Sequence, residues 1–389
     1  MKRVSPFSLL LLGLLAAIGS CRRDAEVGPA EDCLVKASAR NGEILPGEFI
    51  VSFQNPIVSG PVEARVADVS GDILATNRID EAALEQTFAG ATSGFVAHLS
   101  DEQVARLRQD PRVTEVEPDR VVSMCACLDV AEPRSLTWDV RKTGYGNGLN
   151  FSQKTAWIID TGIDLDHPDL NVDRDRSRSF ITGQASADDE NGHGTHVAGI
   201  IGALNNRQGT VGVASGAKLV ALKVLNQLGE GRISGIISAV VHVSQNGRSG
   251  DVVNLSLGGE GTSAILDREV KNAADRGILF AIAAGNEGQA ARNFSPGRFN
   301  HANVFTVSAV DSTDAFASFS NFGNDVVDVA AYGVKIPSTY RGGRYAILSG
   351  TSMAAPHVAG LLLIRGRQFP TRGTARNDPD GQADRIARE

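Results

Sequence analysis

Apolar residues between 148 and 370 are grouped in blocks that have the lengths of buried strands and amphipathic helices. Four runs are short and almost continuously apolar, which is typical of parallel strands covered on both faces: 156–159, 219–224, 252–257 and 277–284. A helical pattern over 233–243 separates the second run from the third. This alternation predicts an α/β fold, a doubly wound and mostly parallel sheet with helices on both faces.

Residues 47–124 show a mixed pattern that predicts a separate unit. Ser100 and Gln103 have the spacing of a capping box, and Val104 and Leu107 fall on one face of the helix that would follow. About eighty residues can form a small domain, so we predict an α+β unit. Its predicted strands are 47–53, 94–99 and 113–116.

The first residues have the features of an export signal. Lys2 and Arg3 precede an apolar run, 9–18, that is too short to span a bilayer. We therefore interpret 1–20 as a signal peptide and 21–46 as a tether. Residues 18–21 resemble a bacterial lipobox, so Cys21 would carry lipid and anchor the protein to a membrane without spanning it. The alternative is ordinary signal cleavage that leaves Cys21 free.

Charge and cysteine content narrow the function only slightly. The formal net charge of −7 and the aromatic content of 5% give no sign of a nucleic-acid surface. Besides Cys21 there are three cysteines, so at most one disulfide closes among them. Cys33 could pair with Cys125 or with Cys127 in an oxidising compartment, and the sequence does not choose.

Four residues suggest nucleophilic catalysis. Ser352 lies among small residues just before the apolar run 357–364, and a serine hydroxyl needs a base to become a nucleophile. His193, between two glycines, could be that base. Asp160 follows the strand 156–159 and could orient the His193 ring. Asn286 follows the run 277–284 and could stabilise an oxyanion. Taken singly, Asp160 could be a cap and Asn286 a turn residue.

Two further histidines have structural rather than catalytic interpretations. His196 lies three residues after His193, but the zinc signature needs histidines four apart with an intervening glutamate. We therefore interpret His196 as structural and His357 as a packed helix histidine.

The order Asp160, His193, Asn286, Ser352 carries a family resemblance. Asp, His and Ser follow one another in this order in subtilisin. From about Lys154 to Ile364 the chain resembles the subtilisin-like serine peptidases, at the segments 159–164, 191–199, 253–259, 285–288 and 349–360. The resemblance implies a serine endopeptidase with a subtilisin-like sheet, in which Ser352 attacks, His193 moves the proton and Asp160 holds His193. Asn286 would contribute to the oxyanion hole.

The same resemblance implies how substrate would bind. Ser256, Leu257 and Gly258 correspond to an edge segment that pairs with substrate backbone. Leu257 would also border the pocket for the residue before the scissile bond, a small apolar pocket together with Ala283, Ala284 and Gly285. Residues 295–297 match a segment that often carries a cis proline.

The resemblance also implies a structural calcium ion, a cation that prefers several oxygen ligands. Asp169 and Asn206 would supply side-chain oxygens, and Leu204, Gln208 and Thr210 would supply carbonyls. The alternative is a polar surface loop.

The organisation that follows is a self-processing zymogen. Residues 47–124 resemble an inhibitory propeptide whose tail, 119–124, runs through the cleft and is cut between 124 and 127. A linker with the mature N-terminal segment (125–147), the catalytic domain (148–370) and a polar C-terminal tail (371–389) complete the chain. We expect polypeptide substrates, the chain's own propeptide and a membrane as partners, and secretion to the bacterial cell envelope. The alternative is a catalytically silent peptide-binding lipoprotein that keeps its propeptide in the cleft.

Overall fold

A computed structural model of the chain describes residues 40–54, 62–90, 92–124, 127–129, 136–145 and 149–389. Its centre is a nine-stranded sheet whose pairs are parallel except at one edge, where the last two strands run antiparallel. The strand order is β18 (Thr371–Thr374), β19 (Arg385–Ala387), β15 (Val329–Tyr332), β14 (Val304–Val310), β12 (Leu279–Ala283), β10 (Val252–Leu255), β6 (Thr155–Asp160), β8 (Lys218–Lys223) and β7 (Arg178–Ser179). This confirms the predicted α/β class.

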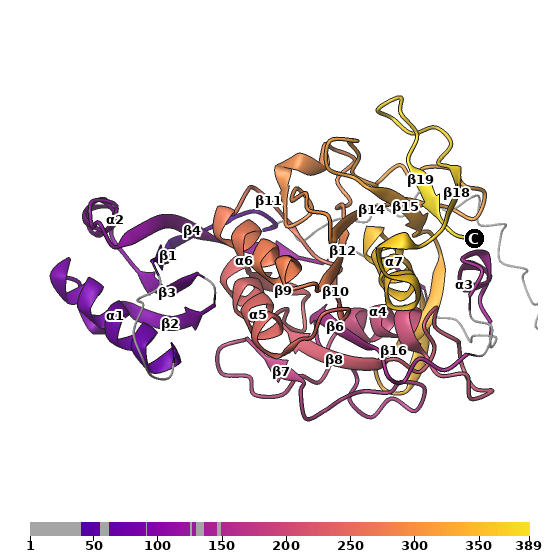
Figure 1. Cartoon of the computed structure of the whole chain (residues 1–389), viewed down its shortest axis with the longest axis horizontal. Helices are drawn as coiled ribbons and strands as arrows, with labels where there is room; N and C mark the ends of the chain where they lie inside the picture. Colours follow the sequence, from indigo (N-terminus) through magenta and orange to yellow (C-terminus); the bar gives the residue numbers. More distant parts are fainter. Residues whose placement is uncertain (1–39, 55–61, 91, 125–126, 130–135, 146–148) are drawn as a thin grey trace, which may run out of the picture. The chain divides into compact units, whose positions relative to one another are not determined.

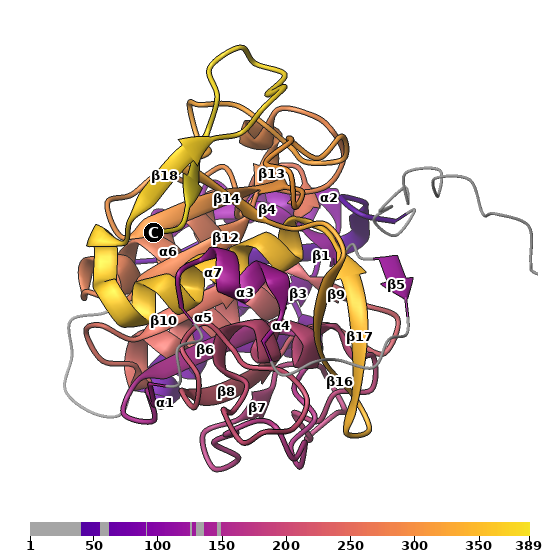
Figure 2. The same ribbon diagram turned by 90° about the vertical axis from the view of Figure 1, so that its right-hand side faces the viewer.

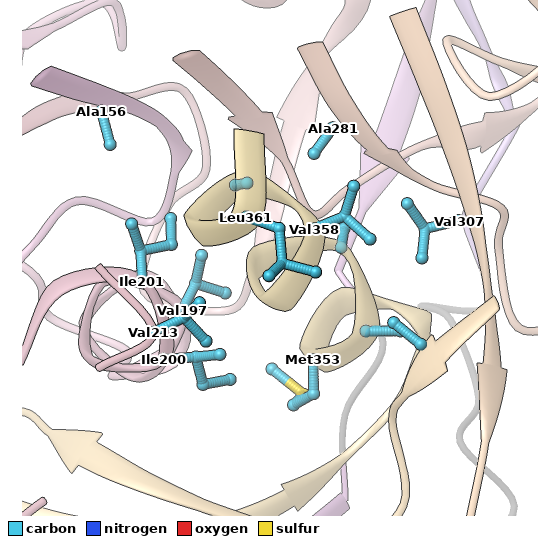
Figure 3. Packing of buried hydrophobic residues seen from close by; sticks show 14 of the residues in the cluster. Ala156, Val197, Ile200, Ile201, Val213, Ala281, Val307, Met353, Val358 and Leu361 are labelled. Carbon is cyan, nitrogen blue, oxygen red and sulfur yellow. The ribbon is translucent and has the colours of Figure 1, made fainter. Parts of the chain in front are cut away.

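Helices cover both faces of this sheet because its strands are apolar on both faces. Helices α4 (His193–Gly202) and α7 (Thr351–Arg365) lie on one face, and α5 (Ile233–Asn246) and α6 (Ala264–Asp275) lie on the other (Figure 1). Along β6, Ala156 and Ile158 belong to the first hydrophobic core, whereas Trp157 and Ile159 belong to the second. Val358 and Leu361 of α7 lie in the first core, near Val307 of β14 (Figure 3).

Smaller elements surround the large sheet. The hairpin of β16 (Ile336–Tyr340) and β17 (Arg344–Ser349) pairs with β5 (Cys127–Asp129) along β17 (Figure 2). The remaining short elements are α3 (Trp138–Lys142), β11 (Gly259–Glu260), β13 (Phe294–Ser295) and the 3₁₀ turns Glu81–Ala83, Ala291–Asn293 and Gly366–Gln368. Within the described residues, no helix combines the length and the apolar character that crossing a membrane would require.

The N-terminal unit is an antiparallel sheet with two helices. Its chain order is β1 (Ile44–Phe53), α1 (Val62–Thr76), β2 (Leu84–Ala89), β3 (Ser93–His98), α2 (Asp101–Leu107) and β4 (Val113–Ser123). The strand order is β2-β3-β1-β4. Strand β9 (Glu230–Arg232) adds to the β4 edge; it belongs to residues 149–389, which we call the catalytic part. The capping box of Ser100 and Gln103 is present, and Val104 and Leu107 are buried, as predicted.

The C-terminal segment corrects our expectation of a solvated polar tail at 371–389. Strand β19 joins the large sheet beside β15, where Ala330 pairs with Ile386. Ile386 and Ala387 are fully buried, and Asp384 is buried and accepts a hydrogen bond from the Ser308 hydroxyl. Two consecutive apolar residues are enough to add this strand, because β15 presents an open edge for backbone pairing.

Candidate active site

Asp160 and His193 form a buried hydrogen-bonded pair at the carboxyl end of β6. His193 Nδ1 lies 2.7 Å from Asp160 Oδ1, and the two side chains are 1% and 0% exposed. The Thr161 N–H donates to the same Asp160 oxygen at 2.7 Å. Because the carboxylate is an acceptor, Nδ1 carries the proton and Nε2 is left as the basic nitrogen.

Glycines allow the histidine to approach Asp160 so closely. A Cβ on Gly194 would lie 2.0 Å from the Gly162 carbonyl oxygen, and a Cβ on Gly192 would meet the Tyr340 ring at 2.3 Å. Gly192 also adopts a φ of +114°, just before α4 begins at His193. The two glycines that flank His193 therefore permit a close backbone approach.

Ser352 lies in the first turn of α7, and its hydroxyl donates to the Ser256 carbonyl at 2.9 Å. The Ser256 hydroxyl donates in return to the Ser352 carbonyl at 2.7 Å. That carbonyl is available because Pro356, four residues on, has no N–H to donate to it. His193 Nε2 has no hydrogen-bond partner among the described residues. Hydrogen bonds between nucleophile and base often form only with substrate bound, so this geometry is compatible with a catalytic pair.

Asn286 is held with its amide nitrogen available. The Thr351 N–H donates to Asn286 Oδ1 at 2.8 Å, and the Thr351 hydroxyl donates to the same atom at 3.0 Å. A backbone N–H can only donate, so the atom that faces it must be the oxygen. The Nδ2 donor is therefore turned away from Thr351, as an oxyanion donor beside Ser352 requires.

One pocket collects the residues that we expected to bind substrate. Leu257, Gly258 and residues 283–285 line it together with Asn286 and Ser352. Ser256 lies beside it through its two hydrogen bonds with Ser352. The Ser295–Pro296 peptide bond at its border is cis, as the resemblance implied. The pocket is small, and Leu257, Ala283, Ala284 and Phe294 form its apolar part beside polar residues such as Asn286 and Glu287.

The end of the N-terminal unit lies in this cleft as a strand. Val121, Val122 and Ser123 of β4 pair antiparallel with β9. On the opposite edge the Ser123 N–H donates to the Gly258 carbonyl at 3.2 Å. The chain thus forms the middle strand between two edges of the catalytic part, one of which, β9, sequence reasoning missed.

The chain is also held by backbone pairing on both sides of residues 125 and 126. The Met124 N–H donates to the Gly229 carbonyl at 3.1 Å, and Cys127 pairs with Ser349, three residues before Ser352. Residues 125 and 126, which connect these two anchors, lie outside the described residues. The cut that we expected between 124 and 127 falls in this interval.

Two carboxylates of β4 cap helices of the catalytic part. Asp119 accepts from the Ser234 hydroxyl and, at 3.2 Å, from the Ser234 N–H in the first turn of α5. Glu117 accepts from the hydroxyl of Ser263, the residue that caps α6. Both carboxyl groups accept hydrogen bonds from groups at helix N-termini, so both contacts tie the N-terminal unit to the catalytic part. Burial raises the pKa of Asp119 and raises the pKa of Glu117 to about 7.

Ion pairs between the N-terminal unit and the catalytic part surround these caps. Arg232 contacts Glu85 at 3.1 Å and Glu48 at 2.5 Å, and Arg268 contacts Glu115 at 2.7 Å. In each pair the carboxylate belongs to the N-terminal unit and the guanidinium to the catalytic part. The sequence did not indicate these pairs, because the position of a charged residue along the chain does not identify the partner that it meets in the fold.

The expected calcium ligands lie together around Asp169. The Asp169 side chain is fully buried, and its Oδ2 accepts from the Thr210 N–H at 3.0 Å and from the Tyr345 hydroxyl at 3.3 Å. Its Oδ1 has no hydrogen-bond partner among the residues that the structure describes. The Leu204 N–H donates to the Asp169 carbonyl at 2.9 Å, and Asn206 Oδ1 accepts from the Gln208 N–H at 2.9 Å. Burial raises the pKa of Asp169 to about 6. The described residues include no cluster of three or more histidine, cysteine or acidic side chains that could hold a metal.

The two other histidines are structural, as predicted. His196 is fully buried with Nε2 facing the Ile336 and Ala346 carbonyls at 3.0 and 3.1 Å, and burial lowers its pKa to about 3. His357 is buried against Asp139 of α3 at 3.0 Å. Among the cysteines, Cys21, Cys33 and Cys125 lie outside the described residues, and only the backbone of Cys127 is described. The expected signal peptide, 1–20, also lies outside the described residues.

Comparisons with known proteins agree with this geometry. Residues 157–375 match the subtilase family, and residues 48–124 match the peptidase inhibitor I9 family. The chain is 39% identical over 332 residues to alkaline serine exoprotease A of Vibrio alginolyticus, covering 81% of this chain and 60% of that protein. It is 36% identical over 382 residues to the extracellular serine proteinase of Thermus sp. strain Rt41A, covering 93% and 90%.

A solved structure extends the likeness to three dimensions. The crystal structure of a cold adapted subtilisin-like serine proteinase superimposes with a TM-score of 0.54 at 35% identity, covering 66% of this chain and 95% of that one. The fold, the buried Asp160–His193 pair and these matches define a subtilisin-like serine protease preceded by an inhibitor-type propeptide. The chain belongs to the subtilase family.

Proposed function

We propose that this subtilase is a secreted endopeptidase in which Ser352, His193, Asp160 and Asn286 carry out the chemistry. The Ser352 hydroxyl attacks the peptide carbonyl while His193 Nε2 takes its proton and later returns it to the leaving amine. Asp160 holds the ring through Nδ1 and stabilises its charged form. The observation that carries this proposal is the 2.7 Å Asp160–His193 bond, which leaves Nε2 as the base.

The oxyanion site would consist of two donors. Asn286 Nδ2 would face the cleft because Thr351 holds Oδ1 on the other side of the amide. The N–H of Ser352 lies in the first turn of α7, where helical N–H groups have no partner four residues back. Both donors would stabilise charge that develops on the carbonyl oxygen of the tetrahedral intermediate.

We infer that the enzyme is made as a zymogen that cuts itself between residues 124 and 127. The β4 tail occupies the cleft by backbone pairing on both edges, in the manner of an added substrate strand. Because the bond is tethered at Met124 and Cys127, it is presented to Ser352 at high effective concentration. The helix caps by Asp119 and Glu117 would keep the cut propeptide bound as an inhibitor.

Calcium would occupy the Asp169 loop. A fully buried carboxylate oxygen that no described residue contacts by a hydrogen bond suits a cation ligand better than it suits a polar surface loop. Asp169 and Asn206 would provide side-chain oxygens, and the carbonyls of Leu204, Gln208 and Thr210 would provide the rest. The ion would pin the loop after α4, the helix that begins at His193.

Export and anchoring form the last part of the proposal. Lys2, Arg3 and the apolar run 9–18 support a signal peptide, and Cys21 supports lipid attachment. One relative is described as extracellular. Cys21→Ser should abolish labelling by a fatty acid and release the precursor from the membrane fraction, and unchanged labelling would refute the assignment of Cys21.

Hydrolysis of an apolar peptide substrate tests the catalytic assignment. We expect purified wild-type protein to hydrolyse it and Ser352→Ala to be inactive, with Ser312→Ala, at an exposed position, as a control that keeps activity. Equal activity of wild type and Ser352→Ala would refute the assignment. An inactive wild type that still binds the peptide would favour the silent peptide-binding protein.

A further inference from the structure

A lysine is buried beside the Asp160–His193 pair. Lys223 ends β8 and is the register partner of Asp160 on the adjacent strand β6. Its side chain is 1% exposed, and its ammonium donates to the Thr161 carbonyl at 2.6 Å. Burying an ammonium ion is costly unless opposite charge compensates it. The position of Lys223 therefore needs an explanation that packing alone does not give.

A second buried carboxylate, Asp189, lies close to this lysine. It accepts five hydrogen bonds, and every partner is a donor: the hydroxyls of Thr161 and Thr195 and the N–H groups of Asn191, Gly192 and Thr195. Both hydroxyls already accept a backbone N–H, from Gly194 and Asp164, so their own protons can point to Asp189. Burial raises the pKa of Asp189, and this donor set opposes that effect because it favours the ionised carboxylate.

Thr161 connects the three charged groups. Its N–H donates to Asp160 at 2.7 Å, its hydroxyl donates to Asp189 at 2.9 Å and its carbonyl accepts from Lys223. Asp189 also accepts hydrogen bonds from backbone N–H groups of the segment 191–195, which contains His193. One residue thus places a buried cation among two buried anions and the catalytic histidine.

We propose that Lys223 is a positioning residue for the catalytic pair, which keeps Asp160 and Asp189 ionised together and sets the pH at which His193 becomes a base. The proposal rests on the catalytic roles assigned above. The other charged groups that face Lys223 are Asp188 and Glu190, whose carboxylate lies 3.9 Å away and is 55% exposed. His196, three residues after His193 on α4, is buried and faces two carbonyls.

The sign of the effect follows from electrostatics. A fixed positive charge disfavours the imidazolium form of His193, so removing it raises the histidine pKa. The acid limb of kcat/KM against pH reports that pKa in the free enzyme, so removing the charge of Lys223 should move the acid limb to higher pH. Removing the negative charge of Asp189 should move the acid limb to lower pH. A shift of roughly one pH unit corresponds to unit charges ~10 Å apart at an effective dielectric constant of ~20.

The test compares pH profiles of kcat/KM for processed wild type, Lys223→Met, Asp189→Asn and the double variant. We expect the acid limb to move up in the first variant, down in the second and back toward wild type in the double variant. Lys218→Met, an exposed lysine at the start of the same strand, is the control and should not move it.

A purely structural lysine would lower activity without opposite shifts. An unshifted acid limb in folded Lys223→Met, or shifts of the same sign in both single variants, would overturn the proposal. If Lys223→Met does not fold, Asp189→Asn decides, because an unshifted limb there overturns it equally. Inactivity of Ser352→Ala, measured in parallel, separates a failure of this proposal from a failure of the catalytic assignment.

Discussion

Replacing Asp119 with alanine should weaken the hold of the propeptide on the processed enzyme. The side chain is fully buried, and it accepts both the hydroxyl and the N–H of Ser234 at the start of α5. The buried hydroxyl and N–H of Ser234 would both lose their partner, and each such loss costs about 1–3 kcal/mol. The substitution also removes the cost of burying the carboxylate, so we expect a net loss of roughly 2–4 kcal/mol.

That loss corresponds to a roughly 30- to 1000-fold weaker inhibition constant. The assay measures inhibition of the processed enzyme by added propeptide, residues 47–124, in wild-type and Asp119→Ala form. Asp68→Ala, at an exposed position of α1, is the control and should inhibit like wild type. An inhibition constant for Asp119→Ala within twofold of wild type would show that the cap does not hold the complex together.

Three further predictions concern the oxyanion, the calcium loop and pH. Asn286→Ala should lower kcat by about 10²–10³ with little change in KM, a magnitude taken from subtilisin itself; a changed KM with unchanged kcat would make Asn286 a binding residue. Chelation should lower the melting temperature of the processed enzyme by roughly 5 °C and Asp169→Ala should blunt this response, whereas an unaffected wild type would leave no role for calcium. Burial raises the pKa of Glu117 from 4.5 to about 7 in the complex, so its contribution to propeptide affinity is complete below about 4.5 and is lost as pH rises through 7. Glu117→Gln should flatten that pH dependence and Glu102→Gln, on the exposed side of α2, should not; a slope that persists in Glu117→Gln would assign it to another group.

Sequence patterns predicted the elements that form the core. Continuous apolar runs correctly indicated β6, β8, β10 and β12, because strands buried on both faces leave little room for polar residues. The capping box located α2 for a local reason that needs no tertiary context. The catalytic residues could be proposed only in combination, since each has a common structural explanation when it is taken alone.

The elements that were missed depend on partners far away in the chain. Strand β9 has no apolar pattern, and it is a strand because β4 pairs with it. Strand β19 contributes only two buried residues and exists because β15 has a free edge. Likewise Lys223 reads as the polar end of a strand, and only the fold brings it beside Thr161 and Asp189.

The fragments that the purified protein produces test the central claim most directly. Mass spectrometry with N-terminal sequencing should find that wild-type protein separates under denaturing, reducing conditions into two fragments, with the new N-terminus between Met124 and Cys127. Ser352→Ala should remain a single chain. Cleavage of Ser352→Ala at the same bond in a purified, protease-free preparation would contradict self-processing by Ser352, and a fully active wild type that stays intact would contradict the zymogen.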